Sequence, residues 1–330
     1  MSGEEREALD LARRSGGSGW RCRLFLVLVG LVIGLLVGSC GDGGSEEALA
    51  EGEKIRVTTT TTIITDLVEQ VGGDEVEVTG LMGPGVDPHL YQASQGDVDA
   101  LLEADVVFYN GLFLEGQMED ILEQASQQTP TVQVTEGIPE DRLLESVQYE
   151  GQFDPHVWFD ATLWKMTVDP VVEKLSELTP DAAETFERNG EEYKREIQEL
   201  DVGVEREISS VPEDRRVLVT AHDAFRYFGR QYGMEVRGLQ GISTETEAGA
   251  GDVRRLADYL AEDKIPAIFV ESSVPRRNVE AVQAACRARG WDLEIGGTLY
   301  SDALGEPGTR AGTYVGMFEE NVETITEALR

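Results

Sequence analysis

The stretch Phe153–Asp160, FDPHVWFD, marks a change in the character of the sequence and contains the middle one of only three histidines in 330 residues. The other two are His89, in GVDPHLYQ, and His222, in VTAHDAFRYFG. They lie too far apart along the chain to share one helix or one turn. If the three imidazoles act together, the fold must bring three distant segments to one place.

Before this stretch, segments typical of strands alternate about four times with segments typical of helices. Ser94 is placed to cap a helix that runs to Glu103, and another helix is expected from Gln117. The expected strands are IRVTTTTTII from Ile55, then Glu75–Gly80, Ala104–Tyr109 and Thr131–Val134. This alternation predicts a parallel sheet with helices on both faces.

After the stretch, residues 161–208 show almost no strand pattern. Pro180, between Thr179 and Asp181, suits the first position of a helix. The apolar residues that follow at helical spacing are Phe186, Tyr193, Ile197, Leu200, Val204 and Ile208. They predict one amphipathic helix, roughly 40 Å long at 1.5 Å per residue. Pro170 is expected to break or kink the shorter helix before it.

From Arg216 the alternation of strands and helices resumes. The expected strands are RVLVTA, Glu235–Gly238, AIFVE and WDLEI, and the expected helices are Asp223–Tyr232, Asp252–Glu262, Pro275–Arg289 and Thr313–Leu329. The predicted fold class is therefore α/β, with two lobes that each hold a mainly parallel sheet flanked by helices. The lobes are expected at residues 55–160 and 211–330, joined by connector helices at 161–210.

The N-terminal region has the features of a leader sequence. An apolar run from Leu24 to Val37 follows Arg21 and Arg23 and is about fourteen residues long, which is short for a membrane span. Its ending, VGSC, resembles a bacterial lipobox, which predicts a signal peptide at 1–39 and lipidation of Cys40. The alternative is an uncleaved N-terminal anchor. A Gly/Ser/acidic tether at 40–54 would link Cys40 to the folded part.

The remaining cysteines and the charge restrict the function. Cys22 would leave with the signal peptide and Cys40 would carry lipid, so Cys286 has no intramolecular partner and is expected to be a small buried apolar residue. The net charge of −35 argues against nucleic acid and against binding to anionic lipid.

Each histidine lies where a strand or loop is expected to reach the edge of a sheet, which is where open α/β sheets bind ligands. In both DPH triplets proline fixes the backbone before the imidazole. Three neutral imidazoles suit Zn²⁺ and similar metals. Asp302, in GGTLYSDALG, is the best candidate for a fourth ligand, and Glu271, at the end of AIFVE, is the next choice or a partner of a ligand.

Several acidic residues next to the histidines could support them. Asp87, Asp154 and Asp223 could each accept a hydrogen bond from the second ring nitrogen of the nearby histidine and so fix its tautomer. Asp223 could equally cap the helix after His222. Five aromatic residues near the motifs could wall the site or serve as ordinary core residues: Tyr91, Trp158, Phe159, Phe225 and Tyr227.

These motifs together resemble the metal-binding lipoproteins of bacterial ABC importers, the solute-binding family for zinc and manganese. The resemblance runs from Ile55 to Leu329 and rests on VTTTTTIITDLVEQVGGDEVEVTGLMGPGVDPHLY, FDPHVWFD, LVTAHDAFRYFGRQYGMEV, IFVESSV and GGTLYSDALGEPGTRAGTYVGMFEENV. It implies two lobes bridged by one long helix with the metal between them. Carried over by motif, the ligands would be His89, His156, His222 and Asp302.

The resemblance also bears on which metal is bound. Members dedicated to manganese often have Glu where this chain has His222, so this histidine favours zinc, although some members with three histidines also handle manganese. This chain departs from the family pattern at Ala93, where Pro is common, and in Gly111–Gln152, which lacks the His-rich stretch of many zinc members.

The leading hypothesis is a receptor outside the cytoplasmic membrane, anchored by lipid at Cys40, that binds Zn²⁺ or Mn²⁺ as cargo and passes it to the membrane permease of an ABC importer. It is expected to be a monomer and not an enzyme, and its long helix should limit the lobes to small movements. The alternative, a secreted zinc-dependent hydrolase, needs an open metal position, which Asp302 would fill, and no HExxH motif is present. An additional role in adhesion has no support in the sequence.

Overall fold

The computed structural model describes residues 53–330, so the predicted signal peptide, Cys40 and nearly all of the predicted tether lie outside the described residues. The first lobe contains a four-stranded sheet in the order β2-β1-β3-β4, with every neighbouring pair parallel. Its strands are β1 (Ile55–Thr59), β2 (Val76–Gly80), β3 (Val106–Tyr109) and β4 (Thr131–Gln133). The predicted parallel sheet is confirmed.

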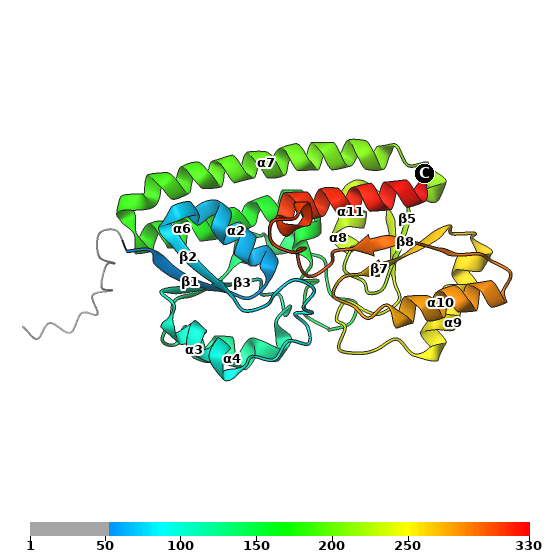
Figure 1. The fold of residues 1–330 in the computed structure, drawn as a ribbon, viewed down its shortest axis with the longest axis horizontal. Coiled ribbons are helices and arrows are strands. Elements are labelled where there is room, and N and C mark those ends of the chain that lie inside the picture. Colours follow the sequence, from blue (N-terminus) through cyan, green and yellow to red (C-terminus); the bar gives the residue numbers. More distant parts are fainter. Residues whose placement is uncertain (1–52) are drawn as a thin grey trace, which may run out of the picture. The chain divides into compact units, whose positions relative to one another are not determined.

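Helices cover both faces of this sheet, as Figure 1 shows. They are α2 (Thr62–Gly72), α3 (Gln95–Glu103) and α4 (Glu119–Ser126). Alternate residues of β3 point to opposite faces, because Val106 and Phe108 belong to the cluster that includes α2, while Val107 packs with Leu101 of α3 and Leu122 of α4. Burial on both faces explains why this strand is continuously apolar.

The connector consists of α5 (Ala161–Trp164), α6 (Val168–Leu178) and α7 (Ala183–Ser209). The predicted long helix is confirmed, because α7 has 27 residues and buries all six apolar residues at the predicted positions. The predicted break near Pro170 is confirmed, because a 3-10 turn at Lys165–Thr167 separates α5 from α6 and Pro170 lies in the first turn of α6. Helix α7 packs against its neighbour α6 in the connector, against α2 of the first lobe and against α11 of the second (Figure 1).

The second lobe contains two parallel pairs, β5-β6 and β7-β8, and β5 lies next to β7. The strands are β5 (Val217–Thr220), β6 (Glu235–Gly238), β7 (Ala267–Glu271) and β8 (Glu294–Leu299). The helices are α8 (Arg226–Tyr232), α9 (Ala250–Glu262), α10 (Arg277–Ala288) and α11 (Tyr314–Leu329). Cys286 is buried, as expected, within the apolar cluster that includes α9 and α10. The α/β fold class with two lobes is therefore confirmed.

One strand of this lobe lies later in the chain than predicted. Strand β8 begins three residues after Trp291 and continues through Gly296 and Gly297, which a pattern based on side chains does not favour. A Cβ atom on Gly296 would lie 2.6 Å from Cε1 of Phe269, and Gly297 has a φ of 147°. The two glycines therefore allow β8 to pass close to β7 at an irregular register.

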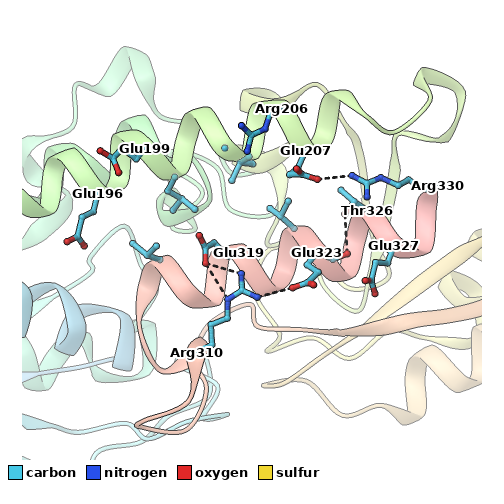
Figure 2. Close-up of a pocket in the computed structure, with 15 residues that line it drawn as sticks. Glu196, Glu199, Arg206, Glu207, Arg310, Glu319, Glu323, Thr326, Glu327 and Arg330 are labelled. Carbon is cyan, nitrogen blue, oxygen red and sulfur yellow. Dashed lines mark hydrogen bonds and ion pairs between the residues drawn. The ribbon is translucent and has the colours of Figure 1, made fainter.

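A groove of about 660 Å³ lies between α7 and α11 (Figure 2). Its charged lining consists of six glutamates and three arginines: Glu196, Glu199, Glu207, Glu319, Glu323, Glu327, Arg206, Arg310 and Arg330. Arg310 pairs with Glu319 and Glu323, and Arg330 pairs with Glu207. No helix in the described part of the chain combines the length and apolar composition needed to cross a membrane.

Candidate metal centre

The fold brings the three histidines and Asp302 together from both lobes. His89 lies in the Gly/Pro loop between β2 and α3, and His156 precedes the short helical turn Val157–Phe159. His222 follows the carboxyl end of β5, and Asp302 follows that of β8. All four side chains are buried, and their potential ligand atoms lie within 4.8 Å of one another.

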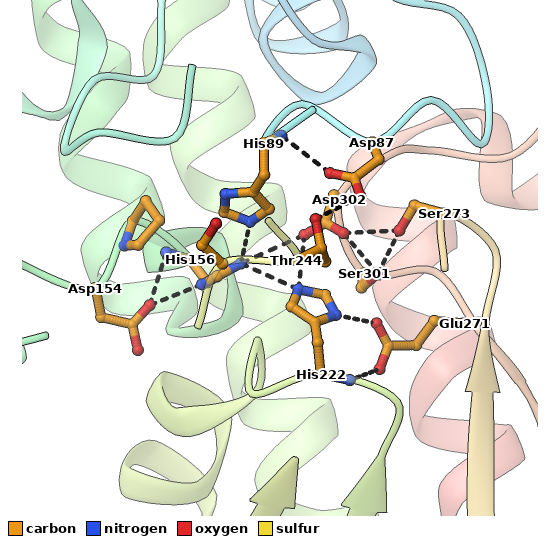
Figure 3. A network of polar contacts seen from close by, with 12 residues as sticks. Asp87, His89, Asp154, His156, His222, Thr244, Glu271, Ser273, Ser301 and Asp302 are labelled. Carbon is orange, nitrogen blue, oxygen red and sulfur yellow. Dashed lines mark hydrogen bonds and ion pairs between the residues drawn. The ribbon is translucent and has the colours of Figure 1, made fainter. Parts of the chain in front are cut away.

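The four side chains point at a common centre (Figure 3). The Nε2 atom of His156 lies 3.4 Å from Nε2 of His89 and 3.4 Å from Nε2 of His222. The Oδ1 atom of Asp302 lies 3.4 Å from Nε2 of both His156 and His222. A tetrahedron with zinc–nitrogen bonds of about 2.0–2.1 Å has edges of about 3.3–3.4 Å. Four of the six separations therefore match the edges of a tetrahedral metal site, and the remaining pairs, which involve His89, lie within 4.8 Å.

Asp302 provides a second indication of a metal site. Its Oδ1 atom is buried and has no hydrogen-bond partner among the described residues, which is costly for a carboxylate oxygen. Its Oδ2 atom, in contrast, accepts from Ser273 Oγ at 2.7 Å and from Ser301 Oγ at 3.0 Å. A cation at the common centre would satisfy Oδ1, so the residues present fit a bound divalent metal.

Two carboxylates hold two of the imidazole rings from behind. Asp154 accepts from Nδ1 of His156 at 2.8 Å and also from its backbone N–H at 3.1 Å. Glu271 accepts from Nδ1 of His222 and from its backbone N–H at 2.9 Å. Each carboxylate thus fixes the tautomer that leaves Nε2 as the ligand atom. Asp154 makes the predicted contact, while Glu271 lies behind His222 and outside the group of four potential ligands.

The other two acidic candidates do not contact a ring. Asp87 accepts from the backbone N–H of His89 at 2.9 Å and from Oγ1 of Thr244 at 2.6 Å. Asp223 lies 3.9 Å from Nε of Arg226, and α8 begins three residues after it without a side-chain cap. Asp223 therefore neither accepts from the ring of His222, which bonds to Glu271, nor caps α8, because the helix begins three residues later.

Burial and charge set the protonation of the ligands in different directions. Burial, together with the neighbouring histidines, lowers the pKa of His89 to about 3, so this ring stays neutral. Burial also disfavours the imidazolium of His156, but the hydrogen bond to Asp154 and the negative charges of Asp154 and Asp302 raise its pKa overall. His222 is likewise buried, and the charges of Glu271 and Asp302 raise its pKa well above the ordinary value. A metal would therefore compete with protons for these two rings more than for His89.

Other supporting residues lie far away in the sequence. Trp158 packs edge-on against His156, with ring centroids 5.2 Å apart, and donates from Nε1 to the carbonyl of Ser301 at 2.9 Å. The sequence did not identify Ser273 and Ser301 as partners of Asp302. Ser273 follows the carboxyl end of β7 and Ser301 that of β8, so their positions at the sheet edge were the only available indication.

Comparison with known proteins gives the class of this molecule. The family model described as zinc-uptake complex component A, periplasmic, matches residues 57–328, and the chain belongs to this family. Its members are metal-binding solute-binding proteins of ABC importers.

Individual relatives cover nearly the whole chain. It is 49% identical to the manganese-binding lipoprotein MntA of Bacillus subtilis, over 88% of this chain and 94% of that protein. It is 48% identical to the zinc-binding protein TroA of Treponema pallidum, over 91% of this chain and 96% of the other. The solved structure of that TroA superposes with a TM-score of 0.82, covering 84% of this chain and 99% of the other. A manganese ABC transporter substrate-binding lipoprotein, PsaA of Streptococcus mitis, is 29% identical over 93% of this chain and 96% of its own length.

Proposed function

We propose that this protein is an extracytoplasmic receptor that binds Zn²⁺ or Mn²⁺ through His89, His156, His222 and Asp302 and delivers it to the membrane permease of an ABC importer. The relatives bind one or the other of these metals, and one is named as a component of a manganese ABC transporter. The observation that carries the proposal is the convergence of four buried ligand atoms on one centre, with Oδ1 of Asp302 unpartnered.

The geometry favours cargo binding over hydrolysis. A catalytic zinc keeps one position open for water, but here four protein side chains could complete the coordination sphere. The cavity beside His89 has a volume of only about 10 Å³ and is lined by Phe113, Tyr149 and Ile242, among others. This space is too small for an organic substrate. We therefore infer that the protein is not an enzyme.

Metal release requires the segment over His89 to move. Thr244 donates to Asp87, Tyr149 donates to Glu245 at 2.8 Å, and the backbone N–H of Ser243 donates to Gln148 at 3.0 Å. These contacts join the loop after β6 to the first lobe. We propose that the lobes span residues 55–160 and 211–330 and that the connector spans 161–210. We also propose that metal leaves when the loop after β6 and its contacts in the first lobe move apart, with little rotation of the lobes.

The relatives' names also support the proposed location. Lipoproteins of this kind would carry a signal peptide at 1–39, lipid on Cys40 and a tether at 40–54, all consistent with the N-terminal sequence. We propose that the protein acts as a monomer anchored to the outer face of the cell membrane.

The test is metal binding by residues 41–330, which omit the predicted lipidated Cys40, purified without metal. Addition of Zn²⁺ or Mn²⁺ at about 100 times its Kd should raise the free energy of unfolding by roughly 2.7 kcal/mol. Metal analysis of protein taken from its native membrane, together with competition titrations, identifies the cargo. Absence of a thermal shift with both metals would contradict the proposal.

A further inference from the structure

Asp66 is a buried carboxylate that lies outside the metal centre. It belongs to α2 of the first lobe and is only 6% exposed. Its Oδ1 atom accepts from Nε2 of Gln70 in the same helix at 3.2 Å, and no basic side chain contacts it in the described part of the chain. Burial raises the pKa of Asp66, because the ionised form is disfavoured away from water. The charge therefore needs compensation from elsewhere in the fold.

The second oxygen of Asp66 joins three helices. Oδ2 accepts from the backbone N–H of Tyr314 at 3.0 Å and from the hydroxyl of Tyr193 at 3.3 Å. Tyr193 lies in the connector helix α7, and Tyr314 is the first residue of α11 in the second lobe. The positive end of α11, a helix of 16 residues, favours a negative charge at this place. One side chain therefore ties the first lobe, the connector and the second lobe where α2, α7 and α11 meet (Figure 1).

The first turn of α11 supports the His156 motif. The hydroxyl of Tyr314 donates to the carbonyl of Trp158 at 2.8 Å. Trp158 lies two residues after His156, and its ring packs edge-on against the imidazole. A shift of this turn would therefore displace the support of His156.

The middle of α11 supports the loop that carries Asp302. Asn321 accepts from the backbone N–H of Tyr300 at 2.9 Å and donates to its carbonyl at 2.8 Å. Tyr300 lies two residues before Asp302. Leu304 lies two residues after it and donates from its backbone N–H to Oγ1 of Thr62 in α2 at 2.8 Å. The helices α2 and α11 thus hold the backbone on both sides of Asp302.

Resting on the proposed function, we infer that Asp66 is a positioning residue of the metal centre. It fixes the N-terminus of α11 on α2 and α7, and α11 then keeps Nε2 of His156 and Oδ1 of Asp302, which come from different lobes, 3.4 Å apart. An apolar side chain would avoid the cost of a buried charge, but it could not join all three helices through one oxygen atom. The metal therefore meets a preformed group of ligands and does not have to order the two lobes.

The test compares Asp66→Leu with Asp66→Asn in residues 41–330. Leucine fills a similar space but accepts no hydrogen bond, whereas the amide oxygen of asparagine can still accept from Tyr314. Gln70→Ala is the matched control, because Gln70 contacts the same carboxylate from within α2. Competition titrations with a chelator give the Kd for Zn²⁺. Spin labels at Gln124→Cys in α4 and Arg254→Cys in α9, both exposed, report the spread of distances between the lobes.

The parent, Gln70→Ala and Asp66→Asn should give a narrow distribution of distances with and without Zn²⁺. Asp66→Leu should give a broad distribution that Zn²⁺ narrows, because the metal must then order the lobes itself. The affinity of Asp66→Leu for Zn²⁺ should fall about three- to thirtyfold, as for residues that act on a site through an intervening element. Asp66→Asn should stay within about threefold of the parent, since it keeps an acceptor for α11.

A Kd in Asp66→Leu equal to that of the parent overturns the inference even if the variant is less stable, because a role in folding alone leaves the metal affinity unchanged. A loss of the same size in Gln70→Ala overturns it as well. If Asp66→Leu fails to fold, Tyr314→Phe breaks the chain of contacts at Trp158, and an unchanged Kd in this variant overturns the inference. A parent that binds no Zn²⁺ contradicts the proposed function itself, which is a distinguishable result.

Discussion

The two sides of the metal centre are built differently. On the fixed side, His156, His222 and Asp302 each have a buried polar partner that orients them. On the loop side, His89 has no carboxylate on its Nδ1 atom among the described residues, and only its backbone N–H is held, by Asp87. The difference indicates a preformed half-site that receives the metal and one movable ligand that closes over it.

The largest expected effect comes from removing one ligand on each side. Both His156→Ala and His89→Ala should weaken Zn²⁺ binding at least about a thousandfold, or about 4 kcal/mol. His156→Ala should also destabilise the metal-free protein more than His89→Ala does, by about 1 kcal/mol, because Asp154 keeps Arg226 but loses the hydrogen bond from Nδ1. Calorimetry and denaturant unfolding without metal measure both effects. Equal metal-free stability of the two variants would contradict the distinction between the sides.

Acidification should weaken Zn²⁺ binding by protonating the histidines of the fixed side. The pKa values of His156 and His222 are raised in the metal-free protein, whereas the pKa of His89 is lowered to about 3. The raised pair stabilises the metal-free state below about pH 6.5, and this contribution is lost as the pH rises through the raised values. Metal needs neutral rings, so the affinity for Zn²⁺ should fall as the pH drops from 8 to 6, by up to about tenfold per pH unit for each ring that takes up a proton.

Thermal shifts with Zn²⁺ at pH 8 and pH 6 test whether the affinity falls on acidification. A larger shift at pH 6 would show that protons do not compete with the metal at these rings. Glu271→Gln removes a charge that raises the pKa of His222, so in this variant the loss of affinity should begin at a lower pH.

At a single neutral pH, Glu271→Gln should reduce the affinity for Zn²⁺ about ten- to hundredfold, because His222 loses its charged anchor. The matched change on the loop side is Asp87→Asn, which touches only the backbone of His89 and the hydroxyl of Thr244. It should change the affinity by less than about threefold by the same reasoning, since no ring is released. Competition titrations decide the order, and a larger loss in Asp87→Asn would reverse the assignment of the two sides.

The smallest effect is kinetic. Thr244→Val removes the hydroxyl that donates to Asp87, worth about 1 kcal/mol, and should speed metal dissociation about fivefold. Thr246→Val, at an exposed position in the same segment, is the control. Stopped-flow release of Zn²⁺ into a chelator measures both rates. Equal rates in the parent and in Thr244→Val would show that this contact does not retain the metal.

The features predicted well from the sequence are those encoded locally. The apolar spacing in α7 and the continuous apolar strand β3 depend on neighbouring residues, so their patterns were sufficient. The four residues of the centre could be chosen because histidine is rare here and because each lies in a compact motif. Their convergence could be expected from the resemblance but not from spacing.

The features that could not be predicted depend on distant contacts. Glu271 was named as an alternative ligand or a partner of one, but nothing near His222 indicates that Glu271, 49 residues later, would hold this particular ring. Asp223 was the nearest acidic residue but points elsewhere, since proximity in sequence does not fix the direction of a side chain. Gly296 is favourable because Phe269 and Ala328 lie against it, and Gly297 because its φ of 147° suits glycine and Thr324 lies against it.

The charges of the groove between α7 and α11 make the stability of this junction depend on ionic strength. Its six glutamates and three arginines leave an excess of three negative charges, 3 − 6 = −3, along the line where α7 and α11 meet over apolar residues such as Leu200 and Val322. Added salt weakens interactions between exposed charges, with a Debye length of about 10 Å at 0.1 M. The repulsion among the glutamates is expected to exceed the attraction in the exposed arginine–glutamate pairs, which contribute little. The junction of connector and C-terminal helix is therefore expected to become more stable as ionic strength rises.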